Sequence, residues 1–399
     1  MNCLIFIAYT AMNKGKYVFA QIASFLPQRV FDSIVVKFNG NYRVRHFSCW
    51  NQMMCMMFGQ LSNRESLSDL VLTVSAHPKK AYHLGFGKGV SKANLAKANE
   101  NRDWRIYQDF AYYLIADARR ICLADDTTGF SFTNPVYAFD STTIDLCLSV
   151  FWWATFRRTK AGMKLHTQYD VRTSIPVFIH ITAASVNDMN AMDELSYESG
   201  SFYVFDRGYI DYDRLHRIHL SNAFFVIRAK SNLQFKRMYS KAVDKSTGIK
   251  CDQIGYLQGL HSRQEYPETI RRIKFHDKEQ HRTFVFLTNN MELKSEVIAE
   301  LYKYRWKIEL FFKWIKQHLK IKTFWGNTEN AVKTQVYIAV ITYTLMAMIR
   351  QQLKTEYSTY EVLQILGTSL LDKTQLNQLL EKQKYQEVKE QLDNQLRIF

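Results

Sequence analysis

The hydrophobic pattern changes character near residue 130. Between residues 15 and 120, apolar side chains recur at the three- and four-residue spacing of helices, most clearly in the segment after Ser91. From residue 135 the pattern changes to short runs rich in β-branched and aromatic residues, which is typical of strands. These runs predict three successive strands at 136–139, 164–169 and 177–183. We therefore expect a helical N-terminal part followed by a sheet.

The following segments alternate strand and helix patterns. A strand at 202–206, a helix at 212–220 and a strand at 223–228 are predicted first. Residues 233–292 then carry further strand patterns, and residues 294–320 predict one long helix. Antiparallel strands followed by alternating helices and strands indicate a mixed α/β sheet.

A further helix is predicted across residues 330–350, and it is the most apolar part of the chain. Its apolar run, Val336–Ile349, has 14 residues. Because crossing a bilayer takes roughly 20 residues, we expect a buried core helix here and no membrane span.

Composition narrows the class of protein. The chain has 399 residues, 47% apolar and 14% aromatic, so it is not disordered and has room for two or three domains of roughly 100–200 residues each. Lys and Arg number 53 against 37 Asp and Glu, a net charge of +16. This excess indicates a polyanionic partner, first a nucleic acid and second an anionic membrane surface. The membrane role is disfavoured because the cations form no amphipathic anchor.

The cysteines show no sign of a metal site or a disulfide framework. They include no C-x-x-C pair and no histidine at zinc-finger spacing. We expect buried, reduced thiols of an intracellular protein. The six residues are Cys3, Cys49, Cys55, Cys122, Cys147 and Cys251.

The N-terminal part carries a loose DNA-binding signal. A glycine-rich turn, HLGFGKGV, precedes one long helix that Ser91 can cap. A helix, a glycine turn and a helix with a basic start favour a helix-turn-helix unit, although an all-helical interaction module shows the same pattern. Residues 1–11 resemble an upstream extension of a frame that starts at Met12, or equally an N-terminal strand after Met1.

Three acidic side chains stand out by position. Asp140 ends the apolar run VYAF and opens the turn DSTT, Asp206 ends the run FYVF and opens the turn DRGY, and Glu309 lies in the long helix. Carboxylates at strand ends project into the crevice where α/β sheets bind ligands, so we expect the three to converge. Their oxygens suit Mg²⁺ or Mn²⁺, and two ions about 4 Å apart can activate and stabilise phosphate oxygens. An Asp at a strand end also caps turns, which is the alternative for either aspartate alone.

The helix that carries Glu309 gives the more specific signal. Tyr302, Arg305, Glu309 and Lys316 follow the spacing Y-x2-R-x3-E-x6-K, which places them within about 60° on one helix face. Residues 301–322 hold seven Lys or Arg and one acid. Basic groups beside a metal-binding acid suit a phosphodiester backbone.

Other cations are candidate phosphate contacts. The segment FWWATFRRTKAGMK interleaves aromatic and basic residues, and residues 228–241 carry five basic residues without an acid. DNA contact is favoured for these cations, whereas core packing is favoured for Trp152 and Trp153. His166 is expected to be a hydrogen-bonded strand histidine. The candidate DNA contacts outside the signature helix are Arg157, Arg158, Lys164, Arg207 and Lys230.

The spacing Y-x2-R-x3-E-x6-K resembles the signature of one group of bacterial insertion-sequence transposases. The segments FDSTTIDL, KAGMKLHTQYD, FYVFDRGY and LYKYRWKIELFFKWIKQHLKIK resemble the core blocks of this group, and KGKYVFAQIASFLPQRVFD resembles its N-terminal domain. The resemblance implies that the three acids form a DDE triad. It also implies that Tyr302, Arg305 and Lys316 engage DNA near the active site.

The resemblance further implies an RNase H-like α/β fold. A mixed sheet with a β-rich insertion would follow a helical DNA-binding domain and precede a helical tail, which is expected to serve packing or dimerisation. The expected boundaries are 1–125 for the N-terminal domain, 130–232 with 293–350 for the catalytic domain, 233–292 for the insertion and 351–399 for the tail.

The implied function is cut-and-paste DNA transposition. The enzyme would bind the inverted-repeat ends of an insertion sequence, cleave them with two Mg²⁺ or Mn²⁺ ions per active site, and join the 3′-OH ends to target DNA. It would act as a homodimer assembled on double-stranded DNA, at the nucleoid in the bacterial cytoplasm. Two alternatives stay open: a metal-dependent, structure-selective DNA nuclease, and a catalytically silent DNA-binding relative.

Overall fold

The computed structural model describes residues 15–382, except for residues 88, 124–131, 148, 150, 158–159 and 319–323. The two alternative starts, Arg158 and residues 383–399 of the tail lie outside the described residues.

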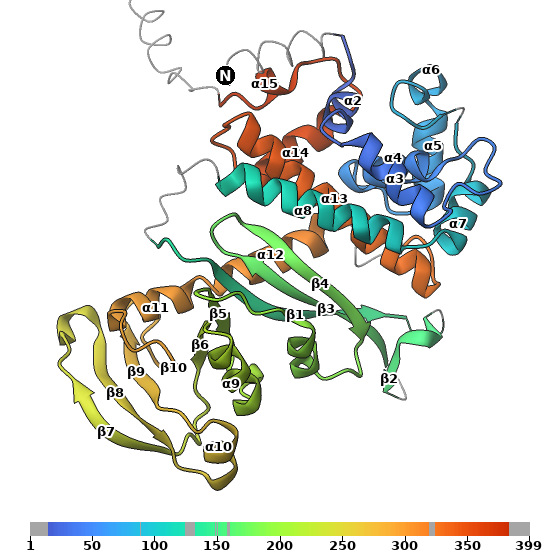
Figure 1. Cartoon of the computed structure of the whole chain (residues 1–399). Coiled ribbons are helices and arrows are strands. Elements are labelled where there is room, and N and C mark those ends of the chain that lie inside the picture. The colour runs from blue at the N-terminus through green and yellow to red at the C-terminus, as the bar shows by residue number, and fades with distance from the viewer. Residues whose placement is uncertain are drawn as a thin grey trace, which may run out of the picture.

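Within the described residues, ten strands form one sheet (Figure 1). Its order is β2-β3-β1-β5-β6-β10-β9-β8-β7, and β4 also pairs with β3. The strands are β1 (Val136–Leu146), β2 (Thr155–Arg157), β3 (Lys160–Asp170), β4 (Ile175–Ala183), β5 (Phe202–Phe205), β6 (Phe224–Arg228), β7 (Phe235–Lys241), β8 (Ile249–Leu257), β9 (Ile270–Asp277) and β10 (Arg282–Thr288).

The first half of the sheet has the predicted RNase H-like arrangement. Strands β1, β3 and β4 form an antiparallel meander. On the other side of β1, β5 and β6 run parallel to it and are joined by α9 (Tyr212–Leu220). The predicted fold class is therefore confirmed.

One predicted turn is wrong. The segment DSTT does not leave the sheet at Asp140, because β1 continues to Leu146 and stays paired with β3, from Asp140 opposite Thr167 to Leu146 opposite Ala161. The β-branched residues of this segment favour an extended backbone. What ends at Phe139 is the pairing of β1 with β5, since the last pair there is Phe139 with Phe205.

Strands β7–β10 continue the same sheet. β10 pairs antiparallel with β6, and β9, β8 and β7 follow, each antiparallel to its neighbour. The prediction of further strands after residue 233 is confirmed. β7 is the outer edge, and five of its seven residues are exposed.

Helices cover both faces of the RNase H-like part of the sheet. Alternate residues of β1 and β5 point to opposite faces, so Val136 and Val204 join the core under the helical layer, whereas Tyr137 and Tyr203 join the core under α9. The remaining helices are α2 (Val18–Ala23), α3 (Gln28–Lys37), α4 (Cys49–Leu61), α5 (Leu67–Ser75), α6 (Pro78–Ala81), α7 (Lys92–Asn101), α8 (Arg105–Leu123), α10 (Leu260–Glu265), α11 (Ser295–Lys303), α12 (Trp306–His318), α13 (Glu329–Gln352), α14 (Thr359–Ser369) and α15 (Leu376–Leu379).

The helix α13 lies at the centre of the helical layer. It packs against α8, α4 and α7, and it also reaches β4. Among the described residues it is the one helix long and apolar enough to cross a membrane, and 94% of its most apolar window is buried inside the protein. The prediction of a buried core helix is confirmed.

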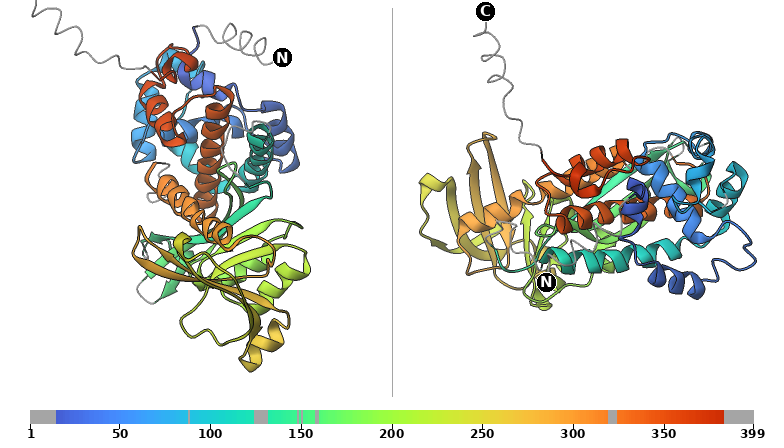
Figure 2. Two further views of the ribbon diagram at one scale, coloured as in Figure 1. Left: turned by 90° about the vertical axis from the view of Figure 1, so that its left-hand side faces the viewer. Right: turned by 90° about the horizontal axis from the view of Figure 1, so that it is seen from above.

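The two ends of the described chain meet in this layer. Figure 2 shows the C-terminal helices packed among the N-terminal ones. The backbone N–H of Val18 donates to Asp372, and the side-chain amide of Gln21 donates to the carbonyl of Thr374. Apolar residues from both ends therefore share one core.

Two helices predicted as continuous are divided. The helix expected from Ser91 splits into α7 and α8 at Arg102, whose backbone is extended, and the Asp103 carboxylate accepts the N–H of Arg105. The helix expected over 294–320 splits into α11 and α12, with a turn at Tyr304 and Arg305.

The cysteines match the prediction in part. Cys49, Cys55 and Cys122 are buried, free thiols, and burial raises the pKa of the Cys49 thiol. Cys147 is exposed and Cys251 is half-buried.

A buried ion pair fastens the insertion to the start of α11. Arg271 and Asp252 are 1% and 3% exposed and form two hydrogen bonds of 2.8 and 2.6 Å. The same guanidinium donates to the carbonyls of Asn290 and Leu293 at 3.2 and 2.6 Å. The pair therefore joins β8 and β9 to the segment that leads into α11.

Asp252→Asn should destabilise the protein by roughly 3–5 kcal/mol, because it leaves the Arg271 charge buried without a counter-ion. Replacing both residues, as Arg271→Met with Asp252→Leu, should recover most of the loss. Urea unfolding of the three proteins measures this. A single variant as stable as the parent would show that the pair does not hold this junction.

Candidate active site

Asp140 and Asp206 lie side by side at the point where the pairing of β1 with β5 ends. Phe139 of β1 pairs with Phe205 of β5, so Asp140 and Asp206 occupy the next position on each chain. Asp206 directly follows β5 and precedes a short 3₁₀ helix. The strand register therefore brings these two residues next to each other, where the β1–β5 pairing ends.

Glu309 reaches the same place from the helical layer. It lies in the first turn of α12, which packs against β1 and whose Ile308, Phe311 and Ile315 are buried. The predicted amphipathic helix is present from Trp306 onward, and its half-buried side carries Glu309.

The other signature residues each contact an element of the sheet. The hydroxyl of Tyr302 donates to Asp206 Oδ1 at 3.2 Å. Arg305 donates through Nη1 to Asp140 Oδ2 at 3.3 Å and through Nη2 to Glu309 Oε1 at 2.5 Å. Lys316 donates to the carbonyl of Thr143 on β1 at 2.7 Å. The division of the predicted helix does not scatter these residues, because Tyr302 lies in the last turn of α11 and Arg305 in the turn before α12.

Burial and mutual repulsion alter the ionisation of Asp140. The pKa of this carboxyl is raised to about 6: burial is the main cause, the nearby Glu309 and Asp206 add to the rise, and the Ser141 N–H and Arg305 oppose it. The repulsion shows that the three acids lie close enough to interact through space. Burial also raises the pKa of the Tyr302 hydroxyl to about 12, so this residue stays a hydrogen-bond donor.

A polar network behind Asp140 was missed by the sequence analysis. The Ser141 hydroxyl donates to Asp188 at 2.8 Å, and Lys164 lies 3.1 Å from the same carboxylate. The Tyr209 hydroxyl lies 3.5 Å from Asp140 Oδ1. Tyr209 belongs to the motif DRGY after Asp206, so the sequence could have pointed to it. Asp188 directly follows the helix cap Asn187, and no sequence pattern distinguishes it.

His166 behaves as the predicted strand histidine. Its Nε2 lies 2.9 Å from the hydroxyl of Thr182, and burial lowers its pKa to about 4. The ring is therefore neutral at physiological pH.

The remaining DNA-contact candidates occupy different surroundings. Arg207 and Lys230 are exposed, whereas the ammonium of Lys164 donates to the Val186 carbonyl at 2.7 Å and faces Asp188. The side chain of Arg157, like Arg158, lies outside the described part. The Trp153 indole donates to the Asn327 carbonyl at 2.8 Å and its ring packs on Phe151, in keeping with the predicted core role.

The three acids fit a divalent metal by their chemistry, since hard oxygen ligands suit Mg²⁺ and Mn²⁺. In the described ranges, however, no three His, Cys, Asp or Glu side chains are grouped closely enough to hold an ion as they stand. The reason is local: the Arg305 guanidinium lies between Asp140 and Glu309.

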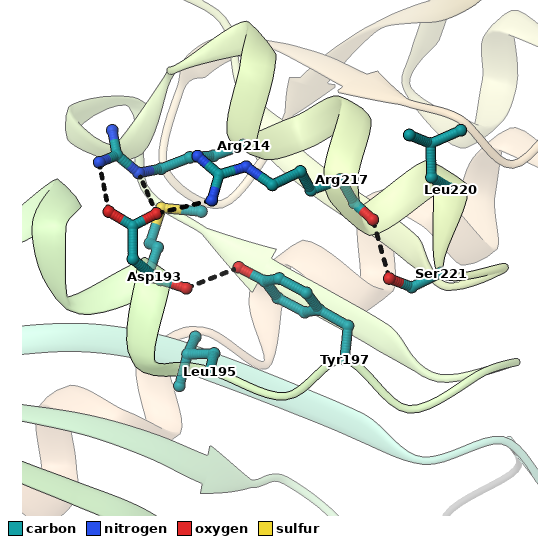
Figure 3. Close-up of a pocket in the computed structure, with 8 residues that line it drawn as sticks. Asp193, Leu195, Tyr197, Arg214, Arg217, Leu220 and Ser221 are labelled. Carbon is teal, nitrogen blue, oxygen red and sulfur yellow. Dashed lines mark hydrogen bonds and ion pairs between the residues drawn. The ribbon is translucent and has the colours of Figure 1, made fainter.

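A separate cavity of about 400 Å³ lies between α9 and the segment after β4 (Figure 3). Arg214 and Arg217 line it, but both already pair with Asp193, at 2.6 and 3.0 Å. The three acids do not line this cavity, so it is not part of the candidate site. Its lining residues are Met192, Asp193, Leu195, Tyr197, Arg214, Arg217, Leu220 and Ser221.

Comparison with known families gives two matches. Residues 131–345, more than half of the chain, match the family described as Transposase DDE domain. Residues 14–87 match a Domain of unknown function (DUF4372). The first match includes all three acids and all the signature residues.

Individual relatives give the same family. The chain is 37% identical over 210 residues to "Putative transposase y4zB" of Sinorhizobium fredii, covering 52% of this chain and 58% of that protein. It is 30% identical over 240 residues to "Probable transposase for insertion sequence element IS5377" of Geobacillus stearothermophilus, covering 59% and 62%. The chain thus spans about three-fifths of these relatives.

A solved structure is matched more distantly. The piggyBac transposase synaptic complex with hairpin DNA aligns with a TM-score of 0.45 and 11% identity, over 94% of this chain and 84% of that one. This likeness is too remote to add to the family match.

Asp140→Asn should stabilise the metal-free protein at neutral pH. The folded-state pKa of about 6 exceeds the usual value of about 3.9, so ionising Asp140 costs the folded state roughly 2–3 kcal/mol above pH 6. The cost falls as the pH drops from 6 towards 4, and the advantage of the variant should fall with it. Unfolding in EDTA between pH 5 and 8 tests this, with the exposed Asp145→Asn as control. A pH-independent difference would contradict the assignment.

Proposed function

The chain belongs to the Transposase DDE domain family, and on this premise we propose that it is a DNA transposase that cuts and joins DNA by metal-assisted phosphoryl transfer. The observation that carries the proposal is the convergence of three acids from separate parts of the chain. Asp140 and Asp206 follow the last pair of two parallel strands, and Arg305 links Asp140 to Glu309.

In the proposed mechanism, Asp140, Asp206 and Glu309 hold the divalent ions. When bound, the ions lower the pKa of water or of a 3′-OH and neutralise charge on the phosphate. The protein supplies position and electrostatics, since phosphoryl transfer needs little covalent help. Tyr302 orients Asp206 through its hydroxyl, and the Ser141 N–H fixes one oxygen of Asp140 at 2.8 Å.

Exposed cations beside Asp206 and towards strand β7 suit a DNA backbone. Arg207, next to Asp206, is exposed, and so are Lys230, Lys236 and Arg237 along the approach to and the start of edge strand β7. We propose that they track phosphates of the bound ends, because the net charge of +16 favours an anionic partner.

We propose that the N-terminal helices read the transposon ends. Three glycines of the predicted turn, Gly85, Gly87 and Gly89, have positive φ, and Ser91 caps α7 by accepting the N–H of Asn94. The first turn of α7 exposes Lys92 and Asn94. From Ala76 to Asn99 the sequence holds five lysines and no acid. An exposed, basic helix start after a tight turn suits insertion into a major groove.

The assembled state follows from the reaction. Two ends have to be joined to one target, so we propose a homodimer on DNA and a cut-and-paste reaction in the bacterial cytoplasm. A structure-selective nuclease would share the metal chemistry but would not join strands, and a silent relative would not cut. Joining of labelled ends to a plasmid therefore separates the three.

Replacing any one acid, as Asp140→Asn, Asp206→Asn or Glu309→Gln, should slow Mg²⁺-dependent cleavage of end DNA more than about a hundredfold. Binding of the ends should survive, because the acids contact metal and not the base edges. Gel assays of nicking and of binding measure both. Removing the metal with EDTA should have the same effect as the substitutions. Continued cleavage by the Asp206→Asn protein would refute the triad.

Lys92→Ala with Lys97→Ala should weaken end binding and reduce the slope of log K against log salt by about 0.9 per lysine. Asn94→Ala should instead weaken discrimination between the true end and a scrambled duplex. Fluorescence anisotropy at several salt concentrations gives both values. Lys354→Gln, at an exposed lysine after α13, serves as the control for the loss of one lysine charge outside α7. An unchanged slope would exclude α7 as the reader.

A further inference from the structure

The Arg305 guanidinium occupies the space between two of the three acids. Nη1 lies 3.3 Å from Asp140 and Nη2 lies 2.5 Å from Glu309, and the side chain is 17% exposed. Within the described residues its Nε is buried without a hydrogen-bond partner. Among the described residues, the hydrogen bonds of the guanidinium go to the two carboxylates, and its central carbon lies 5.9 Å from the centroid of the Tyr302 ring.

This cation takes oxygens that a metal ion would need. It binds Asp140 Oδ2 and Glu309 Oε1, whereas the other Asp140 oxygen is taken up by the Ser141 N–H. Partly buried carboxylates that repel one another need a positive charge between them. Arg305 supplies that charge, so a divalent ion has to compete with it.

The backbone around Arg305 is suited to a change of position. The residue lies in the turn between α11 and α12, where Arg305 N–H bonds to the Tyr302 carbonyl and Ile308 N–H bonds to the Arg305 carbonyl, three residues apart in each case. Such a turn leaves the side chain outside a regular helix. A DNA phosphate offers the guanidinium a two-pronged partner equivalent to a carboxylate.

We propose that Arg305 is an internal counter-ion that closes the metal site in the DNA-free protein and moves onto a DNA phosphate when the ends bind. The proposal rests on the proposed function, because it takes the three acids as metal ligands. It makes metal loading depend on DNA. Ions then assemble in the site only when a substrate is present to be cut.

The test measures the affinity of the DNA-free full chain for Mn²⁺. The electron paramagnetic resonance signal of unbound Mn²⁺ reports how much of the ion is bound. Arg305→Gln should bind Mn²⁺ about tenfold more tightly or better than the parent, because the competing charge is gone. Lys303→Gln removes the same charge two residues away, where the ammonium lies 4.0 Å from Asp277, and should leave the affinity unchanged. Equal or weaker binding by Arg305→Gln would overturn the proposal.

Two further variants and one measurement with DNA separate the possible explanations. Arg305→Lys, whose single ammonium cannot bridge both acids, should fall between the parent and Arg305→Gln, and it replaces the latter if that protein does not fold. With a short end duplex bound, the affinity ratio between Arg305→Gln and the parent should fall towards one; an unchanged ratio would exclude release by DNA. Asp140→Asn should lose Mn²⁺ binding. If Asp140→Asn still binds Mn²⁺, the proposed function is wrong. If Asp140→Asn loses Mn²⁺ binding and the Arg305 substitutions do not change the affinity, only the role proposed for Arg305 is wrong.

Discussion

The carboxylates of Asp140, Asp206 and Glu309 repel one another, and the part of the protein that carries the candidate site has to hold them close together. The register of two parallel strands forces Asp140 and Asp206 together, and α12 adds Glu309. Nearby donors offset the repulsion: the Tyr302 hydroxyl donates to Asp206, and the Arg305 guanidinium donates to Asp140 and to Glu309. The pKa of Asp140 stays raised all the same, chiefly because the carboxyl is buried and to a lesser degree because Glu309 and Asp206 lie near it.

The sequence predicted this half of the fold well because its signals are local. Fully buried strands such as FYVF and a helix with one apolar side can be recognised within about ten residues. The strand after Asp140 was missed since DSTT is polar enough for a turn, and only its pairing with β3 keeps it extended. The helix breaks at Arg102 and Arg305 could not be predicted, because the apolar spacing continues across both.

The candidate site could be predicted as a set of residues but not as a geometry. Spacing singled out Tyr302, Arg305, Glu309 and Lys316 together, yet it could not show that Arg305 contacts an aspartate 165 positions earlier. The hydrogen bond between Ser141 and Asp188 could not be predicted either, because it also joins residues from separate segments. Lys164 illustrates the reverse case: a basic residue in a basic segment whose charge is used inside the protein.

The central position of α13 has a consequence for synthesis on the ribosome. The helices near the start of the chain complete their core only with residues 329–352 and with the segment around Asp372. During translation they have to wait, with apolar surface uncovered, until nearly the whole polypeptide has emerged. A shortened product from an early stop codon would therefore be prone to aggregation and degradation, so that incomplete copies of the gene yield little competing protein.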